Sequence, residues 1–175
     1  IFDSWFFESS LGELADKKSE ISHALDQVKK DHTFEKNGAV WLESTKFGDD
    51  KDRVIIREDG RGTYLSADLA YHRNKLDRGF NTIINVWGSD HHGYIKRIEA
   101  TIEAMGYSKK QMKVQLVQFA NLLENGSKIK MSTRSGNFYT LKQLIDDIGP
   151  NASRFYYLSK QADQHLDFDI AVARS

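Results

Sequence analysis

The chain has 175 residues, of which 39% are hydrophobic and 29% charged, a composition typical of a soluble globular unit of one domain or a large part of one. Lysine plus arginine balances aspartate plus glutamate at 25 each, so no overall positive charge indicates nucleic acid binding, and the absence of cysteine excludes disulfides and thiolate metal sites. No apolar run approaches the roughly 20 residues of a membrane span, and no signal peptide pattern occurs, so we expect a cytoplasmic protein without membrane association.

The first 58 residues predict a helix and then short strands. Ile21, Leu25 and Val28 recur at helical spacing within residues 17–30 and predict an amphipathic surface helix. Residues 39–42 and 54–56 are short β-prone pieces, separated by a polar acidic loop.

From residue 59 onward, helices and strands alternate. The patterns predict a helix over residues 66–76, a strand over 82–87, a loop over 88–93, and a helix with Ile95, Ile98, Ile102 and Met105 on one face, ended by Gly106. Such alternation favours an α/β fold with a parallel sheet.

The last third predicts a hairpin and helices. Residues 113–123 are expected to pair with 128–132 across the turn Asn125-Gly126. Thr140 is a candidate cap for a helix that ends at Gly149-Pro150, and Asn151 is a candidate cap for the next helix, so we expect a helical C-terminal segment. Ile1 is not methionine and no turn residue closes the C-terminus, so we expect both ends of the chain to be cut.

The loop Gly88-Ser89-Asp90-His91-His92-Gly93 lies where ligands bind in open α/β sheets, between a strand and the start of a helix. Its glycines allow a close approach of the backbone, and Asp90 can accept two hydrogen bonds from a ribose diol. The histidines leave a metal site open, with Asp90 or His72 as further ligands. We favour a polar loop that contacts substrate.

Tyr64 and Asp68 are four residues apart and can share one face of a helix. A carboxylate beside a phenol suits a planar guanidinium, which it binds through paired charge-assisted hydrogen bonds. The alternative is structural: Asp68 stabilises the start of the helix and Tyr64 packs in the core.

The segment from Asn125 to Asn137 places Lys128, Lys130 and Arg134 among glycines and small hydroxyl residues. Cations in such a loop can stabilise charge on transferred phosphoryl oxygens and on a pyrophosphate leaving group. A solvated basic hairpin tip is the alternative.

Four motifs in order resemble bacterial arginyl-tRNA synthetase, a class I aminoacyl-tRNA synthetase. They are Lys130-Met131-Ser132-Thr133-Arg134-Ser135-Gly136, Gly62-Thr63-Tyr64-Leu65 with Asp68, Val86-Trp87-Gly88 with Asp90-His91-His92, and His165-Leu166-Asp167-Phe168-Asp169. The resemblance implies the second half of a Rossmann-like catalytic domain. It implies a connective part in residues 1–58, a nucleotide- and arginine-binding core in 59–150, and in 151–175 the start of a helical segment that leads to an anticodon-binding domain.

The resemblance further implies a ligase that activates arginine with ATP, with Mg²⁺ expected, and transfers it to tRNA(Arg), as a full-length monomer. Tyr64, Asp68 and His91 match arginine-binding positions, with Asp68 as the guanidinium partner. Gly88 and Asp90 match the segment that holds the ATP ribose.

Lys130, Met131, Ser132 and Arg134 match the ATP-phosphate loop, with Lys130, Ser132 and Arg134 in catalytic roles and no protein metal ligand. The second lysine of this signature is replaced by Thr133, so Arg134, Lys128 or a lysine outside this chain must compensate. The family's upstream His-x-Gly-His element is absent from this sequence, so we expect this piece alone to be inactive.

Two other interpretations stay open. Asp90-His91-His92 after a strand also resembles manganese-dependent phosphoesterases, although those enzymes need paired aspartates after upstream strands and Asp49-Asp50 lies in a polar loop. The other interpretation is a non-catalytic nucleotide- or tRNA-binding module.

Overall fold

The computed structural model describes residues 2–129, 131 and 138–174. The chain divides into two compact units. Unit 1 comprises Ile1–Asn85 and Gly93–Val114, and unit 2 comprises Val86–His92 and Gln115–Ser175. This division by compactness differs from the three segments expected from the sequence, which were drawn by role.

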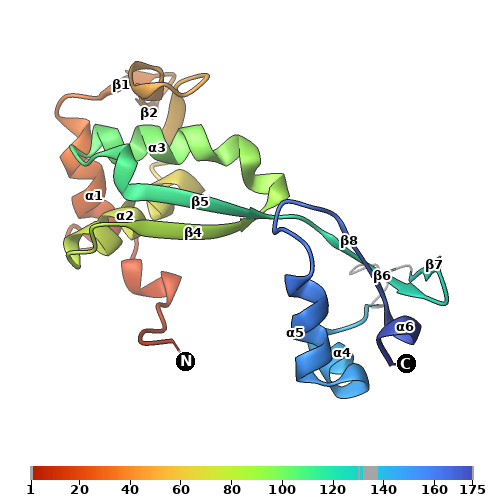
Figure 1. Ribbon diagram of the computed structural model, residues 1–175. Coiled ribbons are helices and arrows are strands. Elements are labelled where there is room, and N and C mark those ends of the chain that lie inside the picture. The colour runs from red at the N-terminus through yellow and green to blue at the C-terminus, as the bar shows by residue number, and fades with distance from the viewer. Residues whose placement is uncertain (1, 130, 132–137, 175) are drawn as a thin grey trace. The chain divides into compact units, whose positions relative to one another are not determined.

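Unit 1 begins with a short 3₁₀ helix, Glu8–Leu11, and helix α1, Glu20–Lys29. The side chain of Ser19 caps α1 by accepting a hydrogen bond from the Ser22 amide at 3.0 Å. Leu25 and Val28 on its apolar face are fully buried, as the sequence predicts, and α1 packs against helix α2, Tyr64–Asp77 (Figure 1).

Three strands of unit 1 form an antiparallel sheet in the order β1, β2, β3, with bounds Thr33–Lys36, Ala39–Leu42 and Arg53–Ile56. The sequence predicts β2 and β3 but not β1. Asn37 and Gly38 join β1 to β2 with φ of 52° and 73°, the left-handed backbone that a tight hairpin turn requires. The acidic loop before β3 is fixed by Arg53, whose Nε lies 2.8 Å from Asp49.

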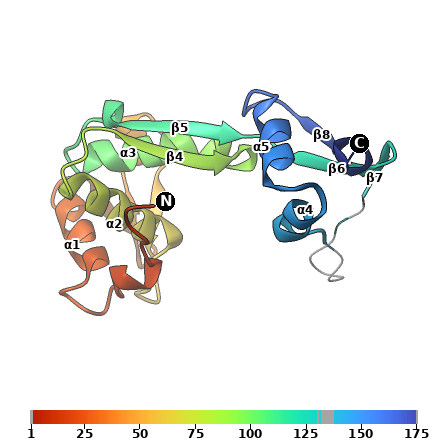
Figure 2. The same ribbon diagram turned by 60° about the horizontal axis from the view of Figure 1, so that its bottom comes forward.

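Strand β4, Ile83–Gly88, helix α3, Ile95–Ala104, and strand β5, Met112–Val117, follow one another in the order strand, helix, strand. β4 and β5 are hydrogen-bonded neighbours, and their arrows point the same way in Figure 2. Ile98, Ile102 and Met105 are buried as expected, and Gly106 ends the helix with φ of 87°. This β-α-β unit confirms the predicted α/β class.

Unit 2 contains strand β6, Ala120–Glu124, strand β7, Ser127–Lys128, and strand β8, Leu166–Asp169. β6 pairs antiparallel with β7 and parallel with β8. Helices α4, Leu141–Ile148, α5, Pro150–Leu158, and α6, Ile170–Arg174, complete the unit. Its buried core consists of Leu122, Leu144, Leu166, Phe168 and Ile170.

The C-terminal part differs in two respects from the sequence-based expectation. The segment 151–175 is not helical throughout, because β8 lies between α5 and α6 and completes a parallel pair with β6. The cap of α5 is Gly149, with Pro150 as the first helical residue, and not Asn151. No helix within the described part of the chain is long and apolar enough to cross a membrane.

Candidate functional site

Helix α2 carries the candidate arginine-binding residues, and its first turn is tied to strand β3. The hydroxyl of Thr63 donates to the Val54 carbonyl at 2.9 Å, and the hydroxyl of Ser66 donates to the Ile55 carbonyl. The helix begins at Tyr64, two residues earlier than the sequence predicts. These bonds fix the end of the helix on which Tyr64 and Asp68 lie.

Asp68 lines a hollow of about 170 Å³ together with Phe6, Glu8, Leu11, Ala67 and Tyr71. Two of the walls are aromatic, since Phe6 and Tyr71 stack with ring centroids 4.7 Å apart. The side chain therefore faces a small apolar hollow with carboxylates, where a planar cation would find both charge and π-faces.

Burial raises the pKa of Asp68 above its ordinary value; a hydrogen bond from Tyr94 opposes the rise, and the carboxylate of Glu8 adds to it. A cation bound in the hollow would offset both the burial and the repulsion. The electrostatics thus favour a positively charged ligand beside Asp68. The alternative in which Asp68 only stabilises the helix start is disfavoured, because Asp68 lies after the first turn of α2.

A buried polar network lies behind Asp68. His72 Nδ1 is 2.8 Å from the Asp68 carbonyl oxygen, and His72 Nε2 is 2.9 Å from Asn85 Nδ2. Lys75 Nζ donates to Asn85 Oδ1 at 2.9 Å and lies 4.0 Å from the centroid of the Tyr71 ring. The network links the backbone of Asp68 to a wall of its hollow.

Burial dominates the protonation of this network. Burial, and after it the charge of Lys75, lowers the pKa of His72 to about 4. Burial likewise lowers the pKa of Lys75 to about 8. At neutral pH His72 is therefore an uncharged hydrogen-bonding group, and the possibility that it serves as a metal ligand is disfavoured because both ring nitrogens already have partners in the protein.

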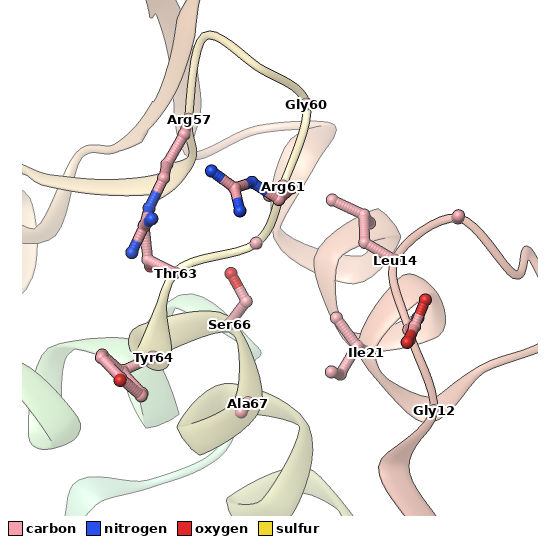
Figure 3. Close-up of a pocket in the computed structure, with 13 residues that line it drawn as sticks. Gly12, Leu14, Ile21, Arg57, Gly60, Arg61, Thr63, Tyr64, Ser66 and Ala67 are labelled. Carbon is pink, nitrogen blue, oxygen red and sulfur yellow. The ribbon is translucent and has the colours of Figure 1, made fainter. Parts of the chain in front are cut away.

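Tyr64 does not share the hollow of Asp68. It lines a larger pocket of about 450 Å³, between the β3–α2 connection and the segment before α1, and its side chain is 80% exposed (Figure 3). Arg57, Arg61 and Thr63 also line this pocket. Both the expectation that Tyr64 presents its phenol beside Asp68 and the alternative that it packs in the core therefore differ from the structure.

The loop after β4 forms a short 3₁₀ helix, Ser89–Tyr94, and the Asp90 side chain lies close to Gly88 at the end of β4. An added Cβ at Gly88 would lie 2.5 Å from Asp90 Oδ1, so the exposed Asp90 carboxylate would have to move to admit a larger side chain there. A Cβ at Gly93 would meet nothing within 4 Å. Of these two glycines, only Gly88 has a side chain close to it, and the close approach of a substrate to either glycine stays a prediction.

The same loop exposes its histidines and is anchored within unit 2. His91 Nε2 lies 3.8 Å from Asp90 Oδ2, and the His91 ring lies 6.4 Å from that of Trp87. The Ser89 hydroxyl donates to Gln118 Oε1 at 2.7 Å, and the backbone amide of Gln118 donates to the Ala162 carbonyl at 2.7 Å.

Among the residues that the structure describes, no group of three or more His, Cys, Asp or Glu side chains could hold a metal ion. The described residues thus offer no such group for the paired metals of a phosphoesterase. Mg²⁺ that arrives with ATP takes most of its ligands from phosphate and water, so this absence does not bear on it.

The phosphate-loop candidate follows the β6–β7 hairpin. Asn125 and Gly126 form the turn with φ of 51° and 75°, and Leu123 pairs with Lys128 as the sequence predicts. The hairpin is shorter than expected, since β7 ends at Lys128 and residues 118–119 interrupt the strand before it. Lys130, Ser132 and Arg134 lie outside the described residues, and Met131 is exposed.

Several residues around these sites escape sequence reasoning. Tyr94, Lys75 and Asn85 contact or support the surroundings of Asp68, and Gln118 anchors the loop after β4. Asn85 gives one usable signal, because a single amide within an apolar strand needs a buried partner. The others act through contacts between segments far apart in the sequence.

The sequence matches a family model and curated proteins. The model of the family described as tRNA synthetases class I (R), catalytic domain, matches residues 6–167. The curated arginine–tRNA ligase of Bacillus licheniformis is 49% identical over 99% of this chain, and that of Oceanobacillus iheyensis is 50% identical over 99%. This chain spans 31% of the length of each of these two relatives.

Two solved structures share the fold. A crystal structure from Campylobacter jejuni, provisionally described as an arginyl tRNA synthetase, aligns with all of this chain and 37% of its own at 41% identity and a TM-score of 0.89. Thermus thermophilus arginyl-tRNA synthetase aligns over 89% of this chain and 36% of its own at 15% identity and a TM-score of 0.67, a likeness of fold alone.

The fold is thus that of a class I aminoacyl-tRNA synthetase catalytic domain. Within that class, the chain belongs to the arginine family, because the family model covers most of its length and close relatives match nearly all of it.

Proposed function

We propose that the protein carrying this chain is an arginine–tRNA ligase that works in the cytoplasm as a monomer. The observation that supports this most strongly is the 49% identity, over 99% of the chain, to a curated arginine–tRNA ligase. The acidic, aromatic-walled hollow of Asp68 supports arginine as the amino acid, since its shape and charge suit a guanidinium.

In the proposed first step, the arginine carboxylate attacks the α-phosphorus of ATP. A bond forms between a carboxylate oxygen and phosphorus, the bond to the bridging oxygen breaks, and pyrophosphate leaves. In the second step, a hydroxyl of the terminal ribose of tRNA(Arg) attacks the arginyl carbonyl and AMP leaves. Catalysis in such a reaction consists mainly of positioning and electrostatic stabilisation.

Asp68 is the proposed partner of the guanidinium, with Tyr64 and His91 as further contacts to arginine. The exposed Tyr64 ring suits a ligand that covers it on binding. Gly88 and Asp90 are proposed to hold the ATP ribose, because the Asp90 carboxylate is exposed and able to accept two hydroxyl hydrogen bonds.

Lys130, Met131, Ser132 and Arg134 are proposed to form the phosphate loop, with Lys130, Ser132 and Arg134 stabilising the charge that develops on pyrophosphate. Thr133 stands where the family signature has a second lysine, so Arg134, Lys128 or a lysine outside this chain is proposed to take that role. Mg²⁺ is proposed to arrive with ATP on the phosphate oxygens, without a dedicated protein ligand.

The test is arginine-dependent exchange of pyrophosphate into ATP by the whole protein, with tRNA(Arg) present. Asp68→Asn removes the charge but keeps the shape, and we expect KM for arginine to rise about 30-fold, roughly 2 kcal/mol, with little change for ATP. Asp26→Asn, at an exposed carboxylate on α1, is the matched control and should behave as the wild type.

Equal effects of Asp68→Asn on arginine and ATP would remove Asp68 from the guanidinium role. Hydrolysis of phosphodiesters that requires Mn²⁺ and ignores arginine would favour a phosphoesterase instead. Binding of tRNA without exchange, from a reading frame that lacks an upstream His-x-Gly-His element, would indicate a non-catalytic module.

A further inference from the structure

Asp169 ends strand β8 and joins three parts of unit 2 through its carboxylate. Oδ2 accepts a hydrogen bond from the Gly126 amide at 2.7 Å, and Oδ1 accepts one from the Ala171 amide at 3.0 Å. The Val172 amide lies 3.4 Å from the same Oδ1. One side chain thus contacts a turn 43 residues earlier in the chain and the helix that follows it.

The contact with Ala171 and Val172 is that of an ordinary helix cap. Asp169 precedes α6, and a cap residue accepts hydrogen bonds from the second and third amides of its helix. A helix of five residues needs such a cap, but the cap uses only Oδ1. The second oxygen is directed to another element.

The contact with Gly126 has no part in capping. Gly126 is in the left-handed region with φ of 75°, at the tip of the β6–β7 hairpin, and its amide is bound by the carboxylate from β8. The amides of Gly126, Val172, Ala171 and Asn125 lower the pKa of Asp169, with Gly126 the largest contributor. The carboxylate therefore stays ionised and holds the turn with a charge-assisted bond.

The turn determines where the following segment begins. Ser127 and Lys128 pair back onto β6, and the Ile129 amide donates to the Leu122 carbonyl at 2.9 Å. These bonds fix the direction of the chain up to Ile129, and the Asp169 carboxylate holds the turn that precedes them from outside the hairpin. The basic segment, residues 128–137, begins at Lys128 and contains the residues that are proposed to bind the ATP phosphates.

We propose that Asp169 is a positioning residue for ATP. Its carboxylate holds the Asn125-Gly126 turn at the end of β8 and so fixes the start of the basic segment. This inference rests on the proposed function for its ligand. Without this hydrogen bond the cations of the segment keep their charge, but the turn from which the segment starts is no longer held in place. The cations are then positioned less accurately relative to the ATP phosphates.

Serine at position 169 separates the two tasks. Serine is as good a helix cap as aspartate, but its side chain is shorter and has one oxygen, so Asp169→Ser keeps the cap of α6 and removes the bond to Gly126. The matched control is Asp167→Ser. Asp167 lies two residues earlier on the same strand and accepts a hydrogen bond from Asn121 Nδ2 at 2.8 Å, away from the turn.

The experiment measures pyrophosphate exchange by the whole protein with ATP varied at saturating arginine, and with arginine varied at saturating ATP. We expect Asp169→Ser to lower kcat/KM for ATP about tenfold, the equivalent of one lost charge-assisted bond, and to change KM for arginine less than twofold. Asp167→Ser should leave both unchanged. Exchange of the Gly126 amide with solvent should accelerate only in Asp169→Ser.

Wild-type kinetics for ATP in Asp169→Ser, an equal loss for both substrates, or the same loss in Asp167→Ser would overturn the proposal. If the Gly126 amide exchanges with solvent at the wild-type rate in Asp169→Ser, the proposal is overturned whatever the kinetics show. If the wild type shows no arginine-dependent exchange, the proposed function fails. Direct titration of the wild type and of Asp169→Ser with ATP then tests the role of Asp169. Equal affinity for ATP overturns that role, and weaker binding by the variant supports it.

Discussion

The two units hold their candidate functional residues in different ways. In unit 1, Asp68 lies on a helix of 14 residues, and its backbone carbonyl belongs to a buried network with His72, Asn85 and Lys75. In unit 2, the basic segment follows a strand of two residues and a turn held by Asp169. A hollow formed by buried contacts suits recognition of one amino acid, whereas in unit 2 the described support of the basic segment lies in the hairpin turn before it.

The largest predicted difference concerns the cores. Phe168 is fully buried and its ring lies 4.6 Å from Tyr156 and 5.8 Å from Tyr157, at the centre of the small core of unit 2. We expect Phe168→Ala to cost about 4 kcal/mol and to unfold unit 2 while unit 1 stays folded. Amide hydrogen exchange should show lost protection in β6, α4 and α5 and retained protection in α1 and α2.

The control for that substitution is Phe155→Ala, because Phe155 is 73% exposed and its loss should change stability by less than about 0.5 kcal/mol. Equal loss of protection in both units after Phe168→Ala would break the comparison, since the two units would then unfold as one.

The second prediction concerns acid. His72 has a pKa of about 4 in the folded protein and 6.5 ordinarily, so the unfolded chain takes up the proton first as pH falls. The stability that this residue contributes is fully present above pH 6.5 and declines toward pH 4, by roughly 3 kcal/mol in total. Urea unfolding followed at α2 between pH 7 and 4.5 measures most of this change.

His72→Gln should lower stability at pH 7 but flatten its decline with acid. His23→Gln, at an exposed position on α1, should leave the decline as it is. If His72→Gln has the same acid dependence as the wild type, the buried network is not what makes unit 1 sensitive to acid.

The smallest predicted effects compare two helix caps. Ser19 accepts from the Ser22 amide in unit 1, and Thr140 accepts from the Gln143 amide in unit 2, both at 3.0 Å. Ser19→Ala and Thr140→Ala should each cost about 1 kcal/mol. We expect each to speed amide exchange in its own unit only. Faster exchange in α1 after Thr140→Ala would show that the units share their stability.

Local chemistry was the part of the fold that the sequence predicted well. Thr140 caps α4, Asn125-Gly126 makes its hairpin turn, and Gly106 ends α3, because each of these needs only neighbouring residues. Asn37-Gly38 carries the same turn signal and marks the hairpin between β1 and β2, whose first strand the sequence analysis does not predict. Leu141 shares the helical spacing of the buried Leu144 but is 61% exposed, since helical spacing does not say how much of a face is covered.

Pairings between distant segments could not be predicted. β8 pairs with β6 in parallel, with Leu122 opposite Phe168, and nothing in residues 166–169 identifies that partner. The hollow around Asp68 depends on Phe6 and Glu8 from the start of the chain, which a pattern within α2 cannot reveal. The sequence therefore indicated the guanidinium partner but not the surroundings that set its electrostatics.

The network behind Asp68 also decides which tautomer His72 adopts. Lys75 donates to Asn85 Oδ1, and this orients the amide so that its Nδ2 group donates to His72 Nε2. Nε2 must then be the acceptor, and the imidazole proton resides on Nδ1, from which it is donated to the Asp68 carbonyl. A positive charge on Lys75 thus selects, through one amide, the nitrogen of His72 that carries hydrogen.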